Sequence, residues 1–247
     1  FKKNRGMRKM VRREVWEVID YAFKENNING VWSFSDNKYK PSKLSNSAPL
    51  KIIRDDSFMV LHMENGLINH VHTGSTEYDG AKMTEKVRAT SEKENMSLGK
   101  SFTFNIKPTP NSFMQLGKRE QTGEDWKEQW KRATKNTFNR TGIEGVWGRQ
   151  MSDPDTIMVK FILDHTWAWV VINKKTGLII RSLGGTFEYN APEYTESAEF
   201  HFKTPNSVGG VLQSKITLDG DTLSLMGAIN RNGEKTQLKE TWQRFEW

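Results

Sequence analysis

Two glutamates at matching places in a repeated strand pattern are the strongest candidates for chemistry in this chain. Glu196 shares one face of the predicted strand 194–202 with Tyr194, and Glu85 shares a face with Met83 in an earlier copy. An inward carboxylate could orient a polar ligand or act as a base with a raised pKa. Alternatively, hydrogen bonds to a neighbouring Tyr, Thr or Arg make it structural. We expect the structural role, because both copies carry it.

Aromatic residues near Glu196 suggest a second kind of site. Trp167, Trp169, Tyr189 and Tyr194 could line the mouth of a cavity and stack on a flat or sugar-like ligand. The alternative is ordinary packing between neighbouring strands. The second copy is richer in these aromatics, so a single binding site is expected there.

The five histidines offer one pair at chelating distance. His70 and His72 stand two apart on a predicted strand, which places both on one face. No third ligand is evident, and neither has a histidine counterpart in the second copy. We therefore expect a surface pair, with no metal and no cofactor. The remaining histidines are His62, His165 and His201.

Known catalytic motifs are missing from the sequence. Cysteine is absent, so disulfides and thiolate chemistry are excluded. No Ser-His-Asp order, phosphate-binding glycine loop or His-Glu-x-x-His motif occurs.

The elements that position these residues occur twice. Gly30-Val31-Trp32 returns as Gly145-Val146-Trp147, and Ser75-Thr76-Glu77-Tyr78 returns as Thr186-Phe187-Glu188-Tyr189. The ending Glu128-Gln129-Trp130-Lys131-Arg132 returns as Glu240-Thr241-Trp242-Gln243-Arg244. Because the order is kept and each unit can bury its own core, we expect two similar domains over 28–132 and 143–247 with a linker over 133–142.

The net charge of +7 comes from the N-terminal segment. Residues 1–13 carry seven basic and no acidic residues, and the rest of the chain carries 30 of each. A nucleic-acid surface would spread its charge over the domains, so we expect no nucleic-acid partner. Residues 1–27 are predicted to form a basic leader with an amphipathic helix over 10–25. No apolar run approaches the length of about 18 residues that spans a bilayer.

Within the units, short alternating segments are separated by tight turns such as Glu64-Asn65-Gly66 and Arg231-Asn232-Gly233. This pattern indicates antiparallel strands. The faces mix aromatics with isolated Glu and Arg, which suits a small barrel better than a dry sandwich. We therefore expect an all-β fold of two tandem up-and-down barrels with short connecting helices. Phe200 and Phe202 are expected to face inward with Glu196.

These motifs resemble the lipocalin superfamily, and more closely bacterial lipocalin-like domains. The likeness rests on Gly-x-Trp in the first strand and Arg after Trp in the last. It covers 143–247 better than 28–132. The resemblance implies that Trp32 packs under Arg132 and Trp147 under Arg244, closing each barrel. It also implies an exported, extracytoplasmic protein.

Three functions remain open. The leading hypothesis is a non-enzymatic protein that binds a small apolar or amphipathic molecule. The second is an enzyme that uses Glu196 with Tyr194 or Tyr189 as an acid–base pair. The third is a closed module for structure or protein binding. A cavity below about 300 Å³ in both barrels would favour the third.

Overall fold

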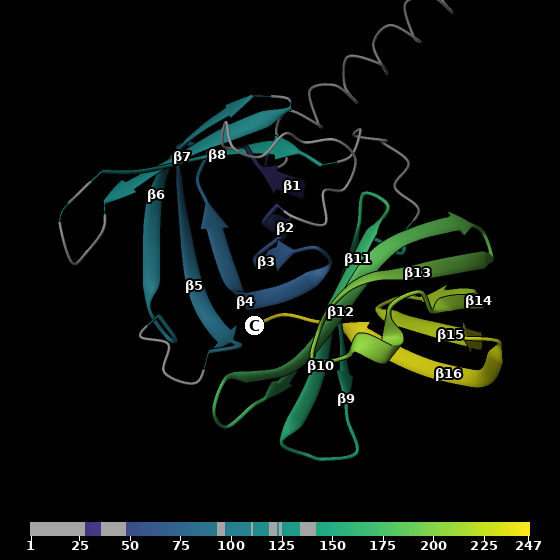
Figure 1. Ribbon diagram of the computed structural model, residues 1–247. Coiled ribbons are helices and arrows are strands. Elements are labelled where there is room, and N and C mark those ends of the chain that lie inside the picture. The colour runs from purple at the N-terminus through teal and green to yellow at the C-terminus, as the bar shows by residue number, and fades with distance from the viewer. Residues whose placement is uncertain are drawn as a thin grey trace, which may run out of the picture.

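The computed structural model describes residues 28–35, 48–92, 97–109, 111–118, 123, 125–133 and 142–247. The predicted leader, its helix and most of the linker lie outside these ranges. Within them the protein is all-β, as predicted, and has no α-helix (Figure 1). No described helix is long and apolar enough to cross a membrane.

Sixteen strands occupy the described ranges. Those of the first half are β1 (Gly30–Phe34), β2 (Leu50–Arg54), β3 (Ser57–Glu64), β4 (Leu67–Tyr78), β5 (Lys82–Thr90), β6 (Ser101–Thr109), β7 (Ser112–Lys118) and β8 (Asp125–Arg132). Those of the second half are β9 (Gly145–Gln150), β10 (Thr156–Leu163), β11 (Thr166–Asn173), β12 (Leu178–Asn190), β13 (Glu193–Phe202), β14 (Val211–Asp219), β15 (Thr222–Arg231) and β16 (Glu234–Arg244). A 3₁₀ turn, η1 (Pro205–Ser207), precedes β14.

The strands belong to one sheet that closes into a ring. Consecutive strands pair antiparallel within each half, β8 pairs with β1, and β16 pairs with β9. Two parallel contacts of one residue pair each join the halves, Leu67 with His201 and Thr90 with Leu178. The two halves are therefore hydrogen-bonded to each other, which the sequence did not predict.

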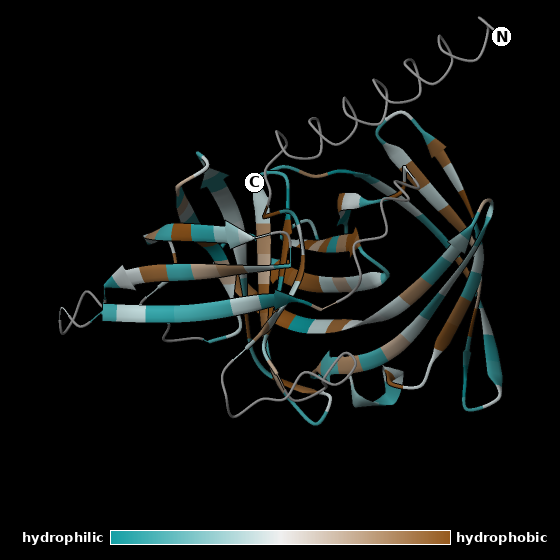
Figure 2. Ribbon diagram, turned by 90° about the horizontal axis from the view of Figure 1, so that it is seen from above, coloured by the Kyte–Doolittle hydropathy of each residue, from teal (hydrophilic) through white to brown (hydrophobic). Residues whose placement is uncertain are grey.

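Tight turns connect neighbouring strands where the sequence expects them. Asn65 and Gly66, between β3 and β4, both have positive φ, as do Asn232 and Gly233 between β15 and β16. Two successive residues with positive φ give the turn whose twist matches a hairpin, and Asn-Gly tolerates it best. Apolar and polar residues alternate along the strands (Figure 2).

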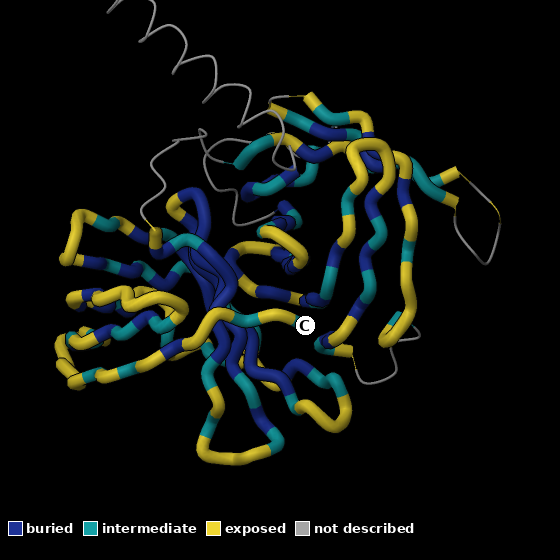
Figure 3. Tube along the Cα trace, turned by 180° about the vertical axis from the view of Figure 1, so that it is seen from behind, coloured by how far each residue is buried: buried dark blue, intermediate teal, exposed yellow. Residues whose placement is uncertain are grey.

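Buried side chains form three clusters. One lies inside the first half and includes Trp32 and Phe58, and one lies inside the second half and includes Trp147 and Trp242. The third, here called the central cluster, contains buried residues from both halves, such as Leu61 and Phe161. Figure 3 shows the buried segments gathered where the halves meet, with exposed residues at the hairpin tips. The outer faces of several strands are thus buried by the other half.

A β-bulge at the same place in each half decides which residues reach the interior. Register shifts occur at Gly74 in β4 and between Gly184 and Gly185 in β12. A Cβ on Gly74 or Gly185 would come within 1.9 Å of a carbonyl oxygen on the next strand, so only glycine fits.

The bulge turns the end of β13 onto the other face. Ala198 packs inside the second half, whereas Phe200 packs in the central cluster with Phe202 beside it. The expectation that Phe200 and Phe202 point inward with Glu196 is therefore wrong. An extra residue reverses the alternation of a strand, and simple alternation cannot show where that happens.

Candidate functional site

Each half carries an arginine over the ring of its first-strand tryptophan. Arg132 Cζ lies 4.4 Å from the centroid of the Trp32 ring, and Arg244 Cζ lies 3.9 Å from that of Trp147. The pairs are cross-strand neighbours between the first and last strands of each half. The indole N–H at the edge of each ring donates to a backbone carbonyl, at 2.8 Å for Trp32 and 2.9 Å for Trp147. The stacked cation and the fixed ring fit a structural role.

A buried lysine–glutamate ion pair lies in the interior of each half. Lys51 Nζ is 2.7 Å from Glu85 Oε1, and Lys160 contacts Glu196 in the same way. Both lysines are 2 % exposed and both glutamates 5 % exposed. Cross-strand pairing sets Lys51 opposite Trp32 and Lys160 opposite Trp147, so the lysines are matched positions. The charges satisfy each other, as buried charges must.

Different third groups complete the two ion pairs. In the second half, the Tyr194 hydroxyl donates a 2.5 Å hydrogen bond to Glu196. Burial, together with the Glu196 charge, raises the pKa of Tyr194 well above its usual value. In the first half, Lys51 donates a 2.9 Å hydrogen bond to the amide oxygen of Gln115. The third group is therefore hydrogen-bonded to the carboxylate in the second half (Tyr194) and to the ammonium group in the first half (Gln115).

A second carboxylate lies nearby in the last strand of each half. The indole N–H of Trp242 donates to Glu240 at 3.1 Å, and Arg149 Nη1 lies 2.8 Å from the same carboxylate. The first half has the same indole–carboxylate hydrogen bond, from Trp130 to Glu128 at 3.1 Å.

The two carboxylates nevertheless differ in their partners. Phe34, two residues after Trp32, matches Arg149 in sequence and packs edge-on against Trp130. Among the residues that the structure describes, no arginine takes this place beside Glu128, and burial raises the pKa of Glu128.

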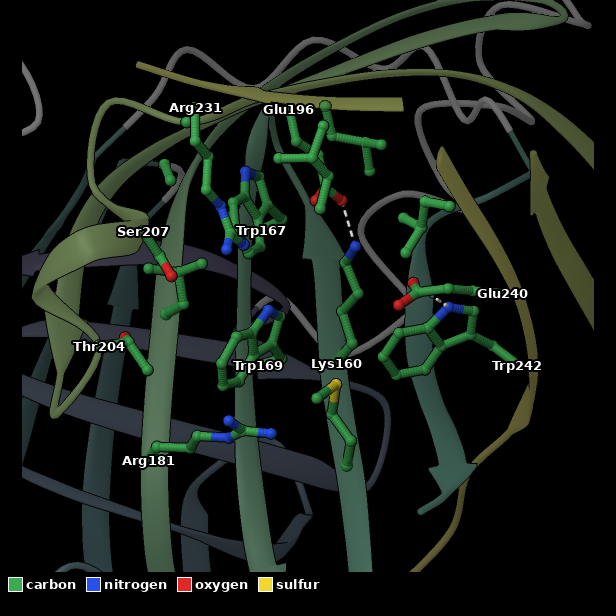
Figure 4. A pocket seen from close by; sticks show the side chains of 17 residues that line it. Lys160, Trp167, Trp169, Arg181, Glu196, Thr204, Ser207, Arg231, Glu240 and Trp242 are labelled. Atoms are coloured by element: carbon green, nitrogen blue, oxygen red, sulfur yellow. Dashed lines mark hydrogen bonds and ion pairs between the residues drawn. The ribbon is translucent and has the colours of Figure 1, made fainter. Parts of the chain in front are cut away.

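A cavity of about 290 Å³ opens beside the second ion pair (Figure 4). Its wall combines Trp167, Trp169 and Trp242 with aliphatic side chains, and the guanidinium groups of Arg181 and Arg231 point toward the tryptophans. Neither arginine has an ion-pair partner among the described residues. The third basic group of the lining, Lys160, is paired with Glu196. The full lining is Met158, Lys160, Trp167, Trp169, Arg181, Leu183, Glu196, Ala198, Thr204, Ser207, Gly210, Leu212, Ile229, Arg231, Leu238, Glu240 and Trp242.

The structure brings together only part of the predicted ligand-binding set. Trp167, Trp169 and Glu196 line the cavity. Tyr194 is buried against Glu196, and Tyr189 packs against Tyr194 with ring centroids 6.4 Å apart; neither lines the cavity. The remaining member, Glu85, lies in the first half as the counterpart of Glu196.

The basic groups of the site were missed in the sequence. Lys160 lies between apolar neighbours in β10, so simple alternation gives no reason to single it out. Its match with Lys51 was a usable signal, because both lysines lie in the strand that follows a Gly-x-Trp strand.

The first half has a wider groove of about 730 Å³ along β6, β7 and β8, lined by Phe104, Trp126 and polar residues.

The histidines also differ from expectation. His62, on β3, pairs directly with His70 on β4. One ring nitrogen from each of His62, His70 and His72 lies within 4.8 Å of the other two. A third partner for the His70–His72 pair could not be predicted from sequence spacing, because only the strand register brings His62 to them. The pKa of all three histidines is lowered, mainly by burial. The pKa of His62 falls to about 4, and that of His72 lies well below its usual value.

A comparison with protein-family models matches no family, and a comparison with curated proteins finds no match. The structure defines the class of the described chain: an all-β protein whose two halves have matched ionic centres.

Proposed function

We propose that this chain is a non-enzymatic binding protein made of two tandem lipocalin-like barrels, and that its second half binds a small amphipathic anion. The barrel arrangement is supported by the strand pairing, because each half could close on itself through β8–β1 and β16–β9. The repeated Trp–Arg contacts and buried Lys–Glu pairs support it further. An extracytoplasmic location is part of this proposal and rests on the family resemblance alone.

The observation that carries the ligand class is the unequal charge of the cavity. Glu196 is neutralised by Lys160, and Glu240 by Arg149 from behind the wall. Arg181 and Arg231 therefore leave the cavity with a positive excess beside an apolar surface of tryptophans. An apolar molecule with one carboxylate or sulfonate matches both features, because guanidinium groups bind such anions in bidentate geometry. The volume of about 290 Å³ limits this ligand to a small one.

Catalysis by Glu196 and a tyrosine has less support. Glu196 is held by Lys160 and by Tyr194, and the raised pKa of Tyr194 keeps its proton on the hydroxyl. A general base must be free to accept a proton from substrate. Here both partners already occupy the carboxylate.

A headgroup series tests the proposal. We expect octanoate to bind to the full chain, with quenching of tryptophan fluorescence, at least tenfold more tightly than 1-octanol or octylammonium. Arg181→Gln and Arg231→Gln should remove this preference. The exposed Lys107→Gln on β6 of the first half, which changes the charge by the same amount away from the cavity, should keep it. Equal binding of the three headgroups, or no effect of the arginine variants, would overturn the anion assignment.

A further inference from the structure

Three histidines of β3 and β4 converge on one point of the first half. His62 lies directly opposite His70, and His72 follows two residues later on the same face of β4. The ring centroids are 5.1 to 5.8 Å apart, and His72 Nδ1 lies 3.1 Å from His70 Nε2. A register irregularity next to His62 adjusts the strands at this point, as bulges near sites often do.

The spacing of the nitrogens suits a metal ion. Imidazole nitrogens bind Zn²⁺ at about 2.0–2.1 Å, so two of them on one tetrahedral ion stand about 3.3 Å apart. The contact between His70 and His72 is close to this value, and all three histidines offer a nitrogen within 4.8 Å of the others.

The outer nitrogen of His70 has the partners that a ligating histidine needs. His70 Nδ1 lies 3.2 Å from Glu92 Oε1 and 3.3 Å from Ser91 Oγ. With its proton on Nδ1, His70 donates to the carboxylate and turns Nε2 toward His72. A carboxylate behind a metal-binding imidazole fixes the tautomer and strengthens the ligand. Glu92 is 57 % exposed, so the cluster lies near solvent, from which an ion can enter.

Within the described ranges, the nearest positive charge to the cluster is the ammonium group of Lys51. The nearby Lys51 is engaged by Glu85 at 2.7 Å. Phe58 packs edge-on against His72 at 5.9 Å and holds one side of the cluster.

The second half shows that the strand pair does not require histidines here. Its matched pair is Val171 opposite Arg181, and Leu183 takes the position of His72. Valine and leucine cannot bind a metal, and arginine stays protonated. The three histidines are therefore a special property of the first half.

We propose that His62, His70 and His72 form a binding site for one divalent transition-metal ion, with Zn²⁺ favoured, and that Glu92 orients His70. Three imidazole ligands suit Zn²⁺ and its neighbours in the series rather than Ca²⁺ or Mg²⁺, which prefer oxygen. Three ligands leave at least one coordination position for water or another molecule. The site does not depend on the anion cavity of the second half.

The test uses the full chain stripped with a chelator and titrated with Zn²⁺ by calorimetry, with the stoichiometry checked by native mass spectrometry. We expect one Zn²⁺ per chain. His62→Val, which copies the matched residue of the second half, should weaken binding at least about tenfold, and the double variant with His70→Ala should abolish it. Glu92→Gln should cause a smaller loss.

The matched control is His165→Asn, because His165 has positive φ, which Asn tolerates, and lies outside the cluster. It should bind Zn²⁺ as the unchanged chain does. Co²⁺ should give the intense visible bands of a four-coordinate ion in the unchanged chain but not in the double variant. Thermal unfolding without metal checks that each variant is folded. The absence of stoichiometric Zn²⁺ binding, or unchanged affinity in a folded double variant, would overturn the proposal.

Discussion

The Tyr194 hydroxyl donates a 2.5 Å hydrogen bond to the carboxylate of Glu196, the same group that Lys160 contacts. Met83 takes the place of Tyr194 in the first half and has no hydroxyl to donate to Glu85. There Gln115 accepts from Lys51 instead. The two buried ion pairs are therefore completed from opposite sides, one at the anion and one at the cation.

Removing one charge of the second pair should be costly. Glu196→Gln leaves the Lys160 ammonium buried without its counter-charge, so we expect the free energy of unfolding to fall by about 3–5 kcal/mol. Urea denaturation checks this. Glu85→Gln should cost less, because Lys51 keeps the oxygen of Gln115. The double variant Lys160→Met with Glu196→Gln should regain much of the loss. If Glu196→Gln leaves the free energy of unfolding unchanged but abolishes ligand binding, the carboxylate is functional instead.

The Trp–Arg contacts make a prediction for stability. Arg244→Ala uncovers the Trp147 ring and should lower the free energy of unfolding by about 1–3 kcal/mol. Arg132→Ala should cost at least as much, since Arg132 also lies 3.6 Å from Asp164 of the second half. Arg244→Lys, which keeps the charge without the planar group, serves as the comparison in the same denaturation series. If all three variants are as stable as the unchanged chain, the stacking role is contradicted.

The two last-strand glutamates should respond oppositely to neutralisation. Burial raises the folded-state pKa of Glu128, so its charged form is disfavoured by folding. The stability that protonated Glu128 contributes is therefore lost as the pH rises from the unfolded-state pKa through the folded-state pKa. At neutral pH, Glu128→Gln should keep or raise the melting temperature.

Glu240→Gln should instead lower stability by about 1–3 kcal/mol, because Arg149 loses its carboxylate. Thermal melts at several pH values from 4 to 8 check the Glu128 assignment, since the advantage of Glu128→Gln over the unchanged chain should grow with pH. A loss of similar size in both variants would contradict the distinction.

The central cluster should behave as a true core. Phe161 is fully buried in it, so Phe161→Ala should cost about 3–5 kcal/mol. Met226 is 62 % exposed on β15, and Met226→Ala should change stability by less than about 0.5 kcal/mol. Chemical denaturation of both variants provides the check. A small effect of Phe161→Ala would mean that the halves hold together without this cluster.

The fold could be predicted from sequence where the signal is local. Alternating segments and Asn-Gly turns gave the all-β class, and the repeated Trp and Arg motifs pointed to pairs that the structure places in contact. The face of Phe200 could not be predicted, because a bulge at Gly184 and Gly185 resets the alternation.

The site was predicted only in part for a related reason. The inward position of Glu196 follows from its own strand, but its partner Lys160 lies on a strand far away in the sequence. The third histidine, His62, likewise meets His70 only through the register of β3 and β4, which sequence spacing does not determine.

The contacts between the halves are equivalent under exchange of the two, since β4 meets β13 as β12 meets β5. This is the geometry of an isologous dimer held in a single polypeptide. In a dimer of identical subunits, every substitution would change both interiors at once. The covalent connection removes that constraint and keeps the partners at a high effective concentration. One interior can then carry histidines and the other an arginine at matched positions, while their shared surface stays the same.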